Sequence, residues 1–204
     1  MADKECVVVV FTRTPETGEV KTRLIPTLGE EKATELYRSM VDRTLRTCRS
    51  SGIDAIELWC HPDTDHPFLV DCSKRYKTGL FVQQGKDLGE RMWFALSDVL
   101  GKYRFGIIIG CDCPDLTPEI LDTAYEKLVE GYDAVIGPAA DGGYYLFGCN
   151  RARKELFSDI AWGTPGVFSN TCVRIKNLKM RCFELEELRD IDRPEDLKTH
   201  VISH

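Results

Sequence analysis

The chain has 204 residues, of which 43% are hydrophobic and 29% are charged, which is typical of a single globular domain spanning residues 1–204. Its formal net charge of −6 argues against general nucleic-acid binding through a basic surface. No apolar stretch approaches the roughly 20 residues of a membrane span, and the amino-terminal segment does not resemble a signal peptide. We therefore expect a cytoplasmic protein without a membrane partner.

Strand-like and helix-like patterns alternate along the first half of the chain. The wholly apolar run at residues 6–11 predicts a strand covered on both faces, and a 3.6-residue apolar stripe over residues 29–51 predicts an amphipathic helix. A second strand is predicted at residues 53–60, followed by a loop over residues 61–77 with at most one helical turn. A short strand from Leu80 then leads into a helix over residues 87–101.

The second half continues this alternation before becoming irregular. Residues 105–110 predict another buried strand, and Thr117 followed by Pro118 is typical of a helix start. Further strands are predicted at residues 133–138, 144–148 and 182–185, with an irregular tail after residue 148. The pattern predicts βαβ units with right-handed crossovers in a three-layer α/β/α sandwich. The strand at 144–148 is expected to return in a hairpin, so that the sheet is mixed but mostly parallel.

A basic loop, FTRTPETGEVKTRLIP, follows the first predicted strand. It is neither a Walker A loop nor a GxGxxG loop, yet it supplies Gly18 together with the cations Arg13, Lys21 and Arg23. In open α/β sheets, ligands bind at the carboxyl ends of the strands. Cations and free backbone N–H groups at that edge suit a di- or triphosphate, although a solvated surface loop has the same composition.

An acidic motif, IIIGCDCPDL, places Asp112 at the end of a buried strand. A carboxylate at that edge suits Mg²⁺ or Mn²⁺, which usually bridge to substrate phosphates. We interpret Asp112 as a metal ligand and Asp115 as a turn or capping residue. Cys111 and Cys113 flank Asp112, but the nine scattered cysteines contain no CxxC pair and are interpreted as small buried hydrophobic residues.

Four other segments carry candidate site residues, each with a purely structural alternative. The sequence at residues 141–143, Asp-Gly-Gly, permits close approach of a ligand, or forms an ordinary hairpin turn. Asp87 and Arg91 contact a substrate or form an i,i+4 ion pair. Trp162 lies in a lid or in a surface loop. Asp192 caps a short helix or supplies a second metal ligand.

The motifs TPETGEVKTRL, QGKDLGERM, GCDCPDL, GPAADGGYYLFG, WGTPGV and DIDRPEDL follow one another between Thr14 and Leu197. Their ordered set resembles the DUF2064 family, whose members are provisionally described as glycosyltransferases of a radical-SAM- or selenodomain-associated type. That family is similar to the nucleotide-diphospho-sugar transferase (GT-A-type) superfamily, which includes nucleotidyltransferases of the molybdenum cofactor and of coenzyme F420. The resemblance covers nearly the whole chain and implies a Rossmann-like transferase.

The resemblance also implies roles for individual residues. Lys21 and Arg23 match the phosphate-contacting loop, and Asp112 and, less directly, Asp192 match metal ligands for Mg²⁺ or Mn²⁺. The expected nucleotide-binding residues are Thr12, Arg13, Gly18, Lys21 and Arg23, the expected catalytic residues are Lys21, Asp112 and Asp141, and the expected substrate-binding residues are Asp87, Arg91, Gly142, Gly143 and Trp162. Asp87 and Asp141 are the two candidates for a general base.

Three functions are compatible with these motifs. The first is metal-dependent glycosyl transfer from a nucleotide sugar to a small-molecule acceptor. The second is nucleotidyl transfer, which joins an NTP to a phosphorylated or sugar substrate and releases pyrophosphate. The third is nucleotide binding without catalysis. The Gly-rich AAGxSxRMG loop that opens the superfamily's nucleotidyltransferases is replaced here by FTRTPETGEVKTR, which favours glycosyl transfer.

Overall fold

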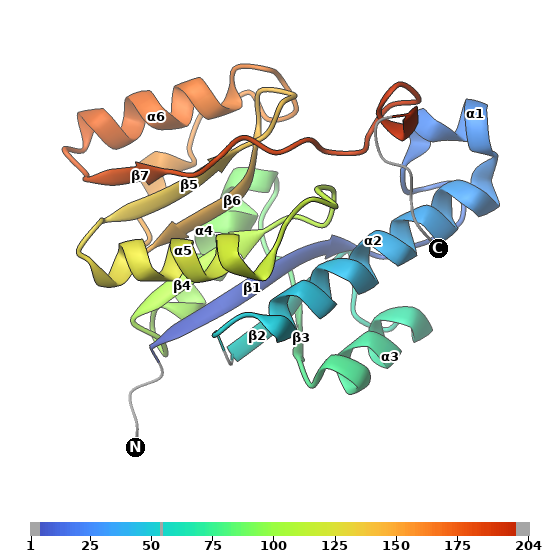
Figure 1. Ribbon diagram of the computed structural model, residues 1–204, viewed down its shortest axis with the longest axis horizontal. Helices are drawn as coiled ribbons and strands as arrows, with labels where there is room; N and C mark the ends of the chain where they lie inside the picture. The colour runs from blue at the N-terminus through green and yellow to red at the C-terminus, as the bar shows by residue number, and fades with distance from the viewer. Residues whose placement is uncertain (1–4, 54, 199–204) are drawn as a thin grey trace.

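The computed structural model describes residues 5–53 and 55–198, and within them seven strands form one sheet (Figure 1). The strands are β1 (Cys6–Arg13), β2 (Ala55–His61), β3 (Gly79–Val82), β4 (Phe105–Ile109), β5 (Ala134–Pro138), β6 (Tyr144–Cys149) and β7 (Cys182–Glu184). Their order is β3-β2-β1-β4-β6-β5-β7. Only β6 runs antiparallel to its neighbours β4 and β5, so the prediction of a mixed, mostly parallel sheet is confirmed.

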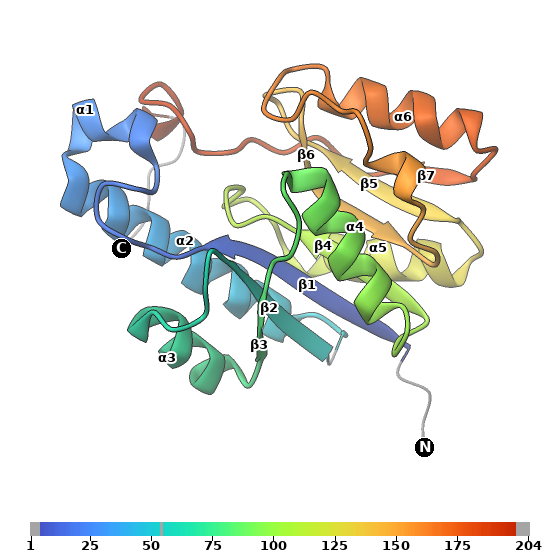
Figure 2. The ribbon, with the colours of Figure 1, turned by 180° about the vertical axis from the view of Figure 1, so that it is seen from behind.

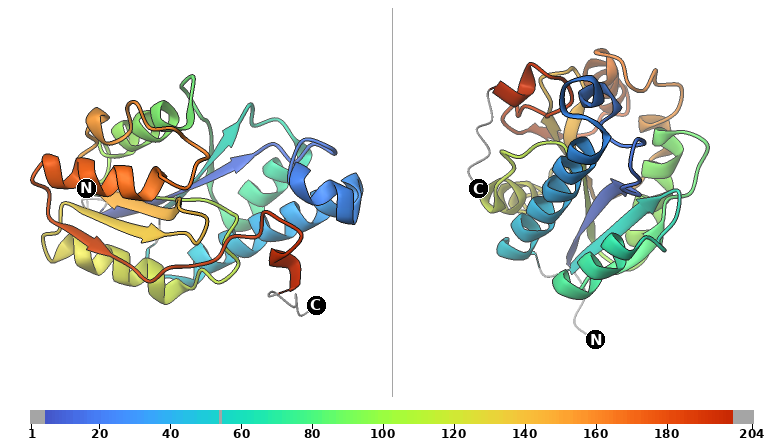
Figure 3. Two further views of the ribbon diagram at one scale, coloured as in Figure 1. Left: turned by 90° about the horizontal axis from the view of Figure 1, so that it is seen from above. Right: turned by 90° about the vertical axis from the view of Figure 1, so that its right-hand side faces the viewer.

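Helices cover both faces of the sheet because β1 is apolar on both faces. The side chains of Val8 and Val10 pack under α2 (Glu30–Ser50), α3 (Pro67–Tyr76) and α5 (Pro118–Val129). The side chains of Val7 and Val9 lie on the other face with α4 (Leu88–Val99) and α6 (Val167–Asn177). The three layers are visible from behind and edge-on (Figures 2 and 3). The predicted α/β/α sandwich is therefore confirmed.

Two parts of the chain form a corner that closes the carboxyl end of the sheet: the short helices that follow β1 and the segment that follows β7. The 3₁₀ helix Thr22–Leu24 and α1 (Ile25–Leu28) follow β1, and Leu24 packs with Ile191 and helix α2 in a small third cluster. After β7, the chain (red in Figure 1) crosses the ends of β5 and β4 toward this corner. The backbone N–H of Leu188 donates to Pro138 (3.0 Å), and that of Ile191 donates to Asp112 (2.9 Å). These bonds bring residues 188–192 to the loop after β4.

Two segments differ from the sequence-based expectation. The predicted loop over residues 61–77 is wrong because α3 begins at Pro67, where the His66 ring nitrogen accepts from the Phe68 N–H (3.1 Å). The prediction of an irregular tail after residue 148 is also wrong, since this part of the chain contains the 3₁₀ helix Lys154–Leu156 and α6. Each missed α-helix buries only a narrow apolar stripe. Thr117 occupies the first cap position of α5, as predicted, but without a capping side-chain hydrogen bond.

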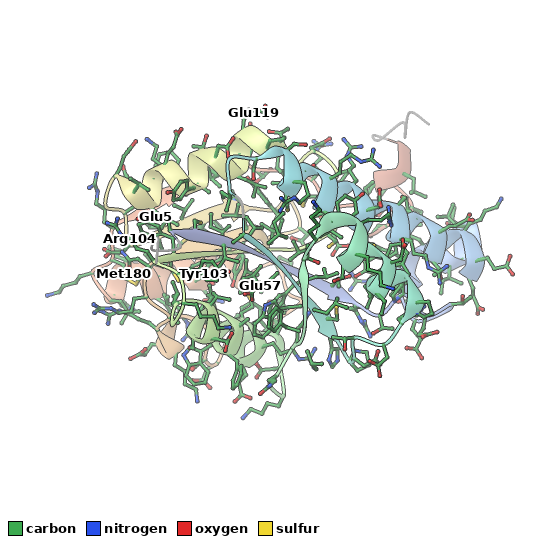
Figure 4. All side chains as sticks on the ribbon, turned by 90° about the horizontal axis from the view of Figure 1, so that it is seen from below. Glu5, Glu57, Tyr103, Arg104, Glu119 and Met180 are labelled. Carbon is green, nitrogen blue, oxygen red and sulfur yellow. The ribbon has the colours of Figure 1, made fainter. Side chains whose placement is uncertain are left out.

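The amino ends of β1 and β4 form the opposite end of the molecule. Glu5 and Arg104 lie close together there (Figure 4), with 3.6 Å between the Glu5 Oε2 and Arg104 Nη1 atoms. None of the helices in the described part of the chain has both the length and the apolar character needed to cross a bilayer. The loops that carry the candidate site residues lie at the other end of the sheet, at the carboxyl ends of its parallel strands.

Candidate active site

A pocket of about 740 Å³ opens at the carboxyl ends of the parallel strands. The chain proceeds outward from β1 to β2 and β3, then returns to place β4 on the other side of β1. The strand order therefore reverses between β1 and β4, and such a switch point is where open α/β sheets bind ligands. Both loops line the pocket.

The end of β1 is held rigidly from two sides. The Tyr37 hydroxyl accepts from the Arg13 N–H (2.8 Å) and lies 3.0 Å from the Thr12 hydroxyl. The Gln83 side-chain amide donates to the backbone oxygen of Thr12 (3.1 Å) and to that of Trp59 (2.9 Å). Burial raises the pKa of Tyr37, so its phenol remains protonated. The neutral hydroxyl can then hold both hydrogen bonds, which fixes the position of Thr12 at the end of β1.

Lys21 ties the basic loop to the acidic side of the pocket. Its side chain is only 4% exposed, and its ammonium group lies 2.6 Å from Asp112 Oδ1 and 4.0 Å from Asp192 Oδ1. The same group donates to the backbone oxygen of Ile191 (2.5 Å). Its backbone adopts the left-handed conformation (φ 49°), which is uncommon for a residue with a side chain and often marks a functional site. Arg23 also forms an ion pair with Asp192.

Four aspartates line the pocket: Asp112, Asp141, Asp190 and Asp192. Asp190 shows how closely these negative charges are gathered. Its burial, and then the nearby carboxylates of Asp141, Asp112 and Asp192, raise its pKa to about 6. Each proton or cation that enters this region therefore relieves electrostatic repulsion.

This crowding predicts a pH-dependent stability. In metal-free protein the contribution of Asp190 to the free energy of unfolding should fall by about 1–2 kcal/mol as the pH rises from about 4 to about 6, because folded Asp190 binds its proton more tightly than the unfolded chain does. The comparison is made by urea denaturation of the wild type and of Asp190→Asn at several pH values. The difference between the two proteins should show this slope, whereas parallel pH profiles would contradict the assignment.

The carboxylates have the chemistry of a magnesium or manganese site. Carboxylate oxygens are the ligands that these ions prefer. Within residues 5–53 and 55–198, no three His, Cys, Asp or Glu side chains are already grouped as metal ligands. The Lys21 ammonium instead neutralises Asp112. Carboxylates of this kind would suit a divalent ion whose remaining ligands came from substrate.

The far wall of the pocket is built from the loop at residues 141–143 and the segment that carries Trp162. The Asp141 carboxylate accepts from the Gly143 N–H (2.7 Å), and Gly142 has a φ of +89°. A Cβ atom on Gly142 would lie 2.2 Å from the backbone oxygen of Pro165, so only glycine fits there. The Trp162 ring packs edge-to-face against Tyr144, with 6.2 Å between centroids.

Helix α4 holds this wall from the opposite side. A Cβ atom on Gly89 would lie 2.7 Å from the Trp162 indole nitrogen and 2.4 Å from the backbone oxygen of Phe157. The absence of a side chain at Gly89 therefore allows the Trp162 segment to approach the first turn of the helix. The segment spans the pocket from α4 to the loop at residues 141–143.

Most of the residues predicted from the sequence meet in this pocket. Those that line it are Thr12, Arg13, Lys21, Arg23, Arg91, Asp112, Asp141, Gly143, Trp162 and Asp192. Gly18, Asp87 and Gly142 do not line it. Asp87 caps α4 by accepting from the Glu90 N–H (2.8 Å), while Gly18 (φ +86°) and Gly142 serve turns. The cysteines at 111 and 113 are buried, as expected, and burial raises their pKa.

The pocket residues that sequence reasoning missed include Tyr37, His61, Gln83 and Asp190. His61 directly follows the predicted strand at residues 53–60, and Gln83 lies near the end of the predicted strand that starts at Leu80. A position at a strand end was the signal in the sequence that could have identified both residues. Burial and the neighbouring guanidinium groups of Arg91 and Arg13 lower the pKa of His61. Asp190 lies two residues before Asp192 in the same motif. Tyr37 was interpreted only as part of the apolar stripe of a helix.

The strand order, the antiparallel β6 and the pocket at the switch point define the α/β fold of the nucleotide-diphospho-sugar transferases. The chain belongs to the DUF2064 family, described as an uncharacterized protein conserved in bacteria, whose sequence model matches residues 44–164. The chain is similar to a protein from Desulfovibrio desulfuricans G20 that is provisionally named a nucleotide-diphospho-sugar transferase. The two are 33% identical with a TM-score of 0.84, over 93% of this chain and 83% of the other.

More distant solved structures share the fold. A cytidylyltransferase from Leptospira borgpetersenii is 16% identical with a TM-score of 0.63, over 96% of this chain and 84% of its own. Glucosyl-3-phosphoglycerate synthase from Mycobacterium tuberculosis, solved with Mn²⁺, UDP and glucosyl-3-phosphoglycerate, is 11% identical with a TM-score of 0.60, over 97% and 76%. No curated protein matches the sequence. At these identities the likeness concerns the fold alone.

Proposed function

We propose that the protein is a metal-dependent transferase that uses a nucleotide-activated substrate and transfers a glycosyl group from a nucleotide sugar to a small-molecule acceptor. The observation that carries this proposal is the pocket at the switch point, where Lys21 joins a basic loop to Asp112. The 33% identity to the Desulfovibrio protein, provisionally named a nucleotide-diphospho-sugar transferase, supports it.

In this proposal the basic side of the pocket binds the donor. Arg13, Lys21 and Arg23 contact the diphosphate, since several cations above strand ends neutralise its charge. Thr12 is held by Tyr37 and Gln83, and it presents a rigid strand end to the nucleoside. Arg91, whose guanidinium donates to the backbone oxygen of Gly85 (3.1 Å), completes that side.

Asp112 and Asp192 would hold the Mg²⁺ or Mn²⁺ ion. When bound there, the ion supplies neutralising charge to the departing diphosphate. The fold of the Mycobacterium tuberculosis synthase, solved with Mn²⁺ and UDP, is similar to that of this chain and motivates this assignment. Lys21 now pairs with Asp112, so phosphate binding would draw its ammonium group toward the donor and release the carboxylate.

The transfer exchanges one bond at the anomeric carbon for another and moves one proton. The acceptor hydroxyl oxygen bonds to the anomeric carbon, and the bond from that carbon to the diphosphate oxygen breaks. The electron pair leaves with the nucleoside diphosphate, and the hydroxyl proton passes to a carboxylate base. Of the two candidate bases, Asp141 lines the pocket while Asp87 caps α4, so we assign Asp141.

Nucleotidyl transfer is the alternative, favoured by the fold shared with the cytidylyltransferase. The two reactions use the same phosphate site and differ in the leaving group. Incubation with a panel of nucleotide sugars and NTPs plus Mn²⁺ separates them, because glycosyl transfer releases a nucleoside diphosphate and nucleotidyl transfer releases pyrophosphate. We expect the diphosphate. Nucleotide binding that is independent of Mn²⁺ or Mg²⁺, without any product, would instead indicate a non-catalytic binding protein.

A further inference from the structure

The charges that line the pocket are divided along the chain. The cationic or ionisable basic residues lining it are Arg13, Lys21, Arg23, His61 and Arg91, all of which precede β4 in the sequence. From Ile108 onward, the described lining residues include four aspartates and no lysine, arginine or histidine.

Two of the four aspartates already have cationic partners. Lys21 pairs with Asp112, and Arg23 pairs with Asp192. Among the ion pairs of the described residues, none involves Asp141 or Asp190. Asp141 and Asp190 therefore keep negative charge that no ion pair of the described residues neutralises.

Two aromatic side chains line the same pocket as these two aspartates. Tyr144 and Trp162 line the pocket and pack edge-to-face against each other. Trp162 is held by the close approach to Gly89 described above, and the backbone oxygen of Gly142 accepts from the Phe168 N–H (2.9 Å). A rigid aromatic surface next to hydrogen-bond acceptors suits the C–H and O–H groups of a polyol.

We infer that the part of the pocket lined by Asp141 and Asp190 accepts a hydroxyl-bearing compound without a phosphate or carboxylate group, such as a neutral sugar, a polyol or an amino sugar. The inference rests on the proposed function and specifies its acceptor. An anionic group placed a few ångströms from Asp141 and Asp190 meets like charge in a partly desolvated pocket. Hydroxyl and ammonium groups instead donate hydrogen bonds to the same carboxylates.

Matched pairs of compounds test this assignment. The protein is first saturated with Mn²⁺ and with whichever of UDP, GDP, CDP or ADP raises its melting temperature most. Calorimetry then compares glycerol with glycerol 3-phosphate, glucose with glucose 6-phosphate, and glucosamine with glucosamine 6-phosphate. We expect the unphosphorylated member of at least one pair to bind, and to bind about tenfold or more tightly than its phosphate ester. Equal or tighter binding of the esters, or no binding of any compound, would overturn the inference.

A charge-removing variant with a matched control strengthens the test. Asp141→Asn keeps an oxygen that accepts from the Gly143 N–H, so the loop is preserved while the charge is lost. The preference for the unphosphorylated compound should shrink several-fold. Glu19→Gln removes a charge from the opposite wall of the same pocket and should leave the preference unchanged. An unchanged preference in Asp141→Asn would count against the assignment.

The outcomes also separate this inference from the proposed function. If no nucleoside diphosphate raises the melting temperature, the proposed function fails and the inference fails with it. If a nucleotide binds and a phosphorylated compound binds beside it as tightly as its neutral partner, only the inference fails.

Discussion

Replacing Lys21 by methionine is expected to lower kcat/KM for the nucleotide-activated substrate by about 10²–10³, the size of effect that removal of one stabilising contact from an active site produces. The Lys21 side chain is buried, and its ammonium group donates to Ile191 and pairs with Asp112 until the donor phosphate draws it away from the carboxylate. The rate is measured as release of nucleoside diphosphate, and donor binding is measured separately by calorimetry.

Lys32→Met is the matched control, because it removes the same charge from the same stretch of chain. Lys32 is exposed on α2 and does not line the pocket, so its loss should change kcat/KM less than about twofold. Circular dichroism and a denaturation curve establish that both variants fold. A Lys21→Met protein that folds and keeps its full rate would exclude the phosphate role of Lys21.

Asp112→Asn should lower turnover by a similar factor of about 10²–10³ and should also abolish the dependence of nucleotide binding on Mn²⁺. The asparagine keeps an oxygen that accepts from the Lys21 ammonium, so the fold is preserved while the carboxylate charge is lost. The measurement is the shift in melting temperature produced by nucleotide with and without Mn²⁺, since a ligand of the native state raises apparent stability.

Asp115→Asn provides the comparison at the same loop, because Asp115 does not line the pocket. It should retain the additional stabilisation that Mn²⁺ gives to the nucleotide complex. If Asp112→Asn retained that stabilisation as well, Asp112 would not be a metal ligand and the proposed role of the ion would have to be abandoned.

The sheet was predictable because its central strands are apolar without interruption. Val7, Val8, Val9 and Val10 are fully buried, and only a strand covered on both faces explains such a run. Helix α6 was not predictable in the same way. It buries Val167, Thr171 and Ile175, a single row of β-branched residues with low helix propensity, and it follows a segment rich in glycine, threonine and proline.

The two sides of the site differ in how far the sequence could predict them. The loops after β1 and β4 meet because adjacent parallel strands end at the same edge, so Lys21 and Asp112 could be placed together before the structure was known. Asp190 could not be placed, because its position depends on backbone bonds such as that between Ile191 and Asp112, 79 residues apart in the sequence. Tyr37 could not be placed either. Its hydroxyl accepts from the Arg13 N–H, but its position in the apolar stripe of helix α2 indicated only core packing.

A crystal structure with a nucleoside diphosphate and Mn²⁺ tests the central claim most directly. UDP, GDP, CDP and their triphosphates are soaked in turn with Mn²⁺, whose anomalous scattering locates the ion. The account predicts phosphate density beside Arg13, Lys21 and Arg23, with the ion on Asp112. Phosphate and manganese density located elsewhere on the molecule would contradict it.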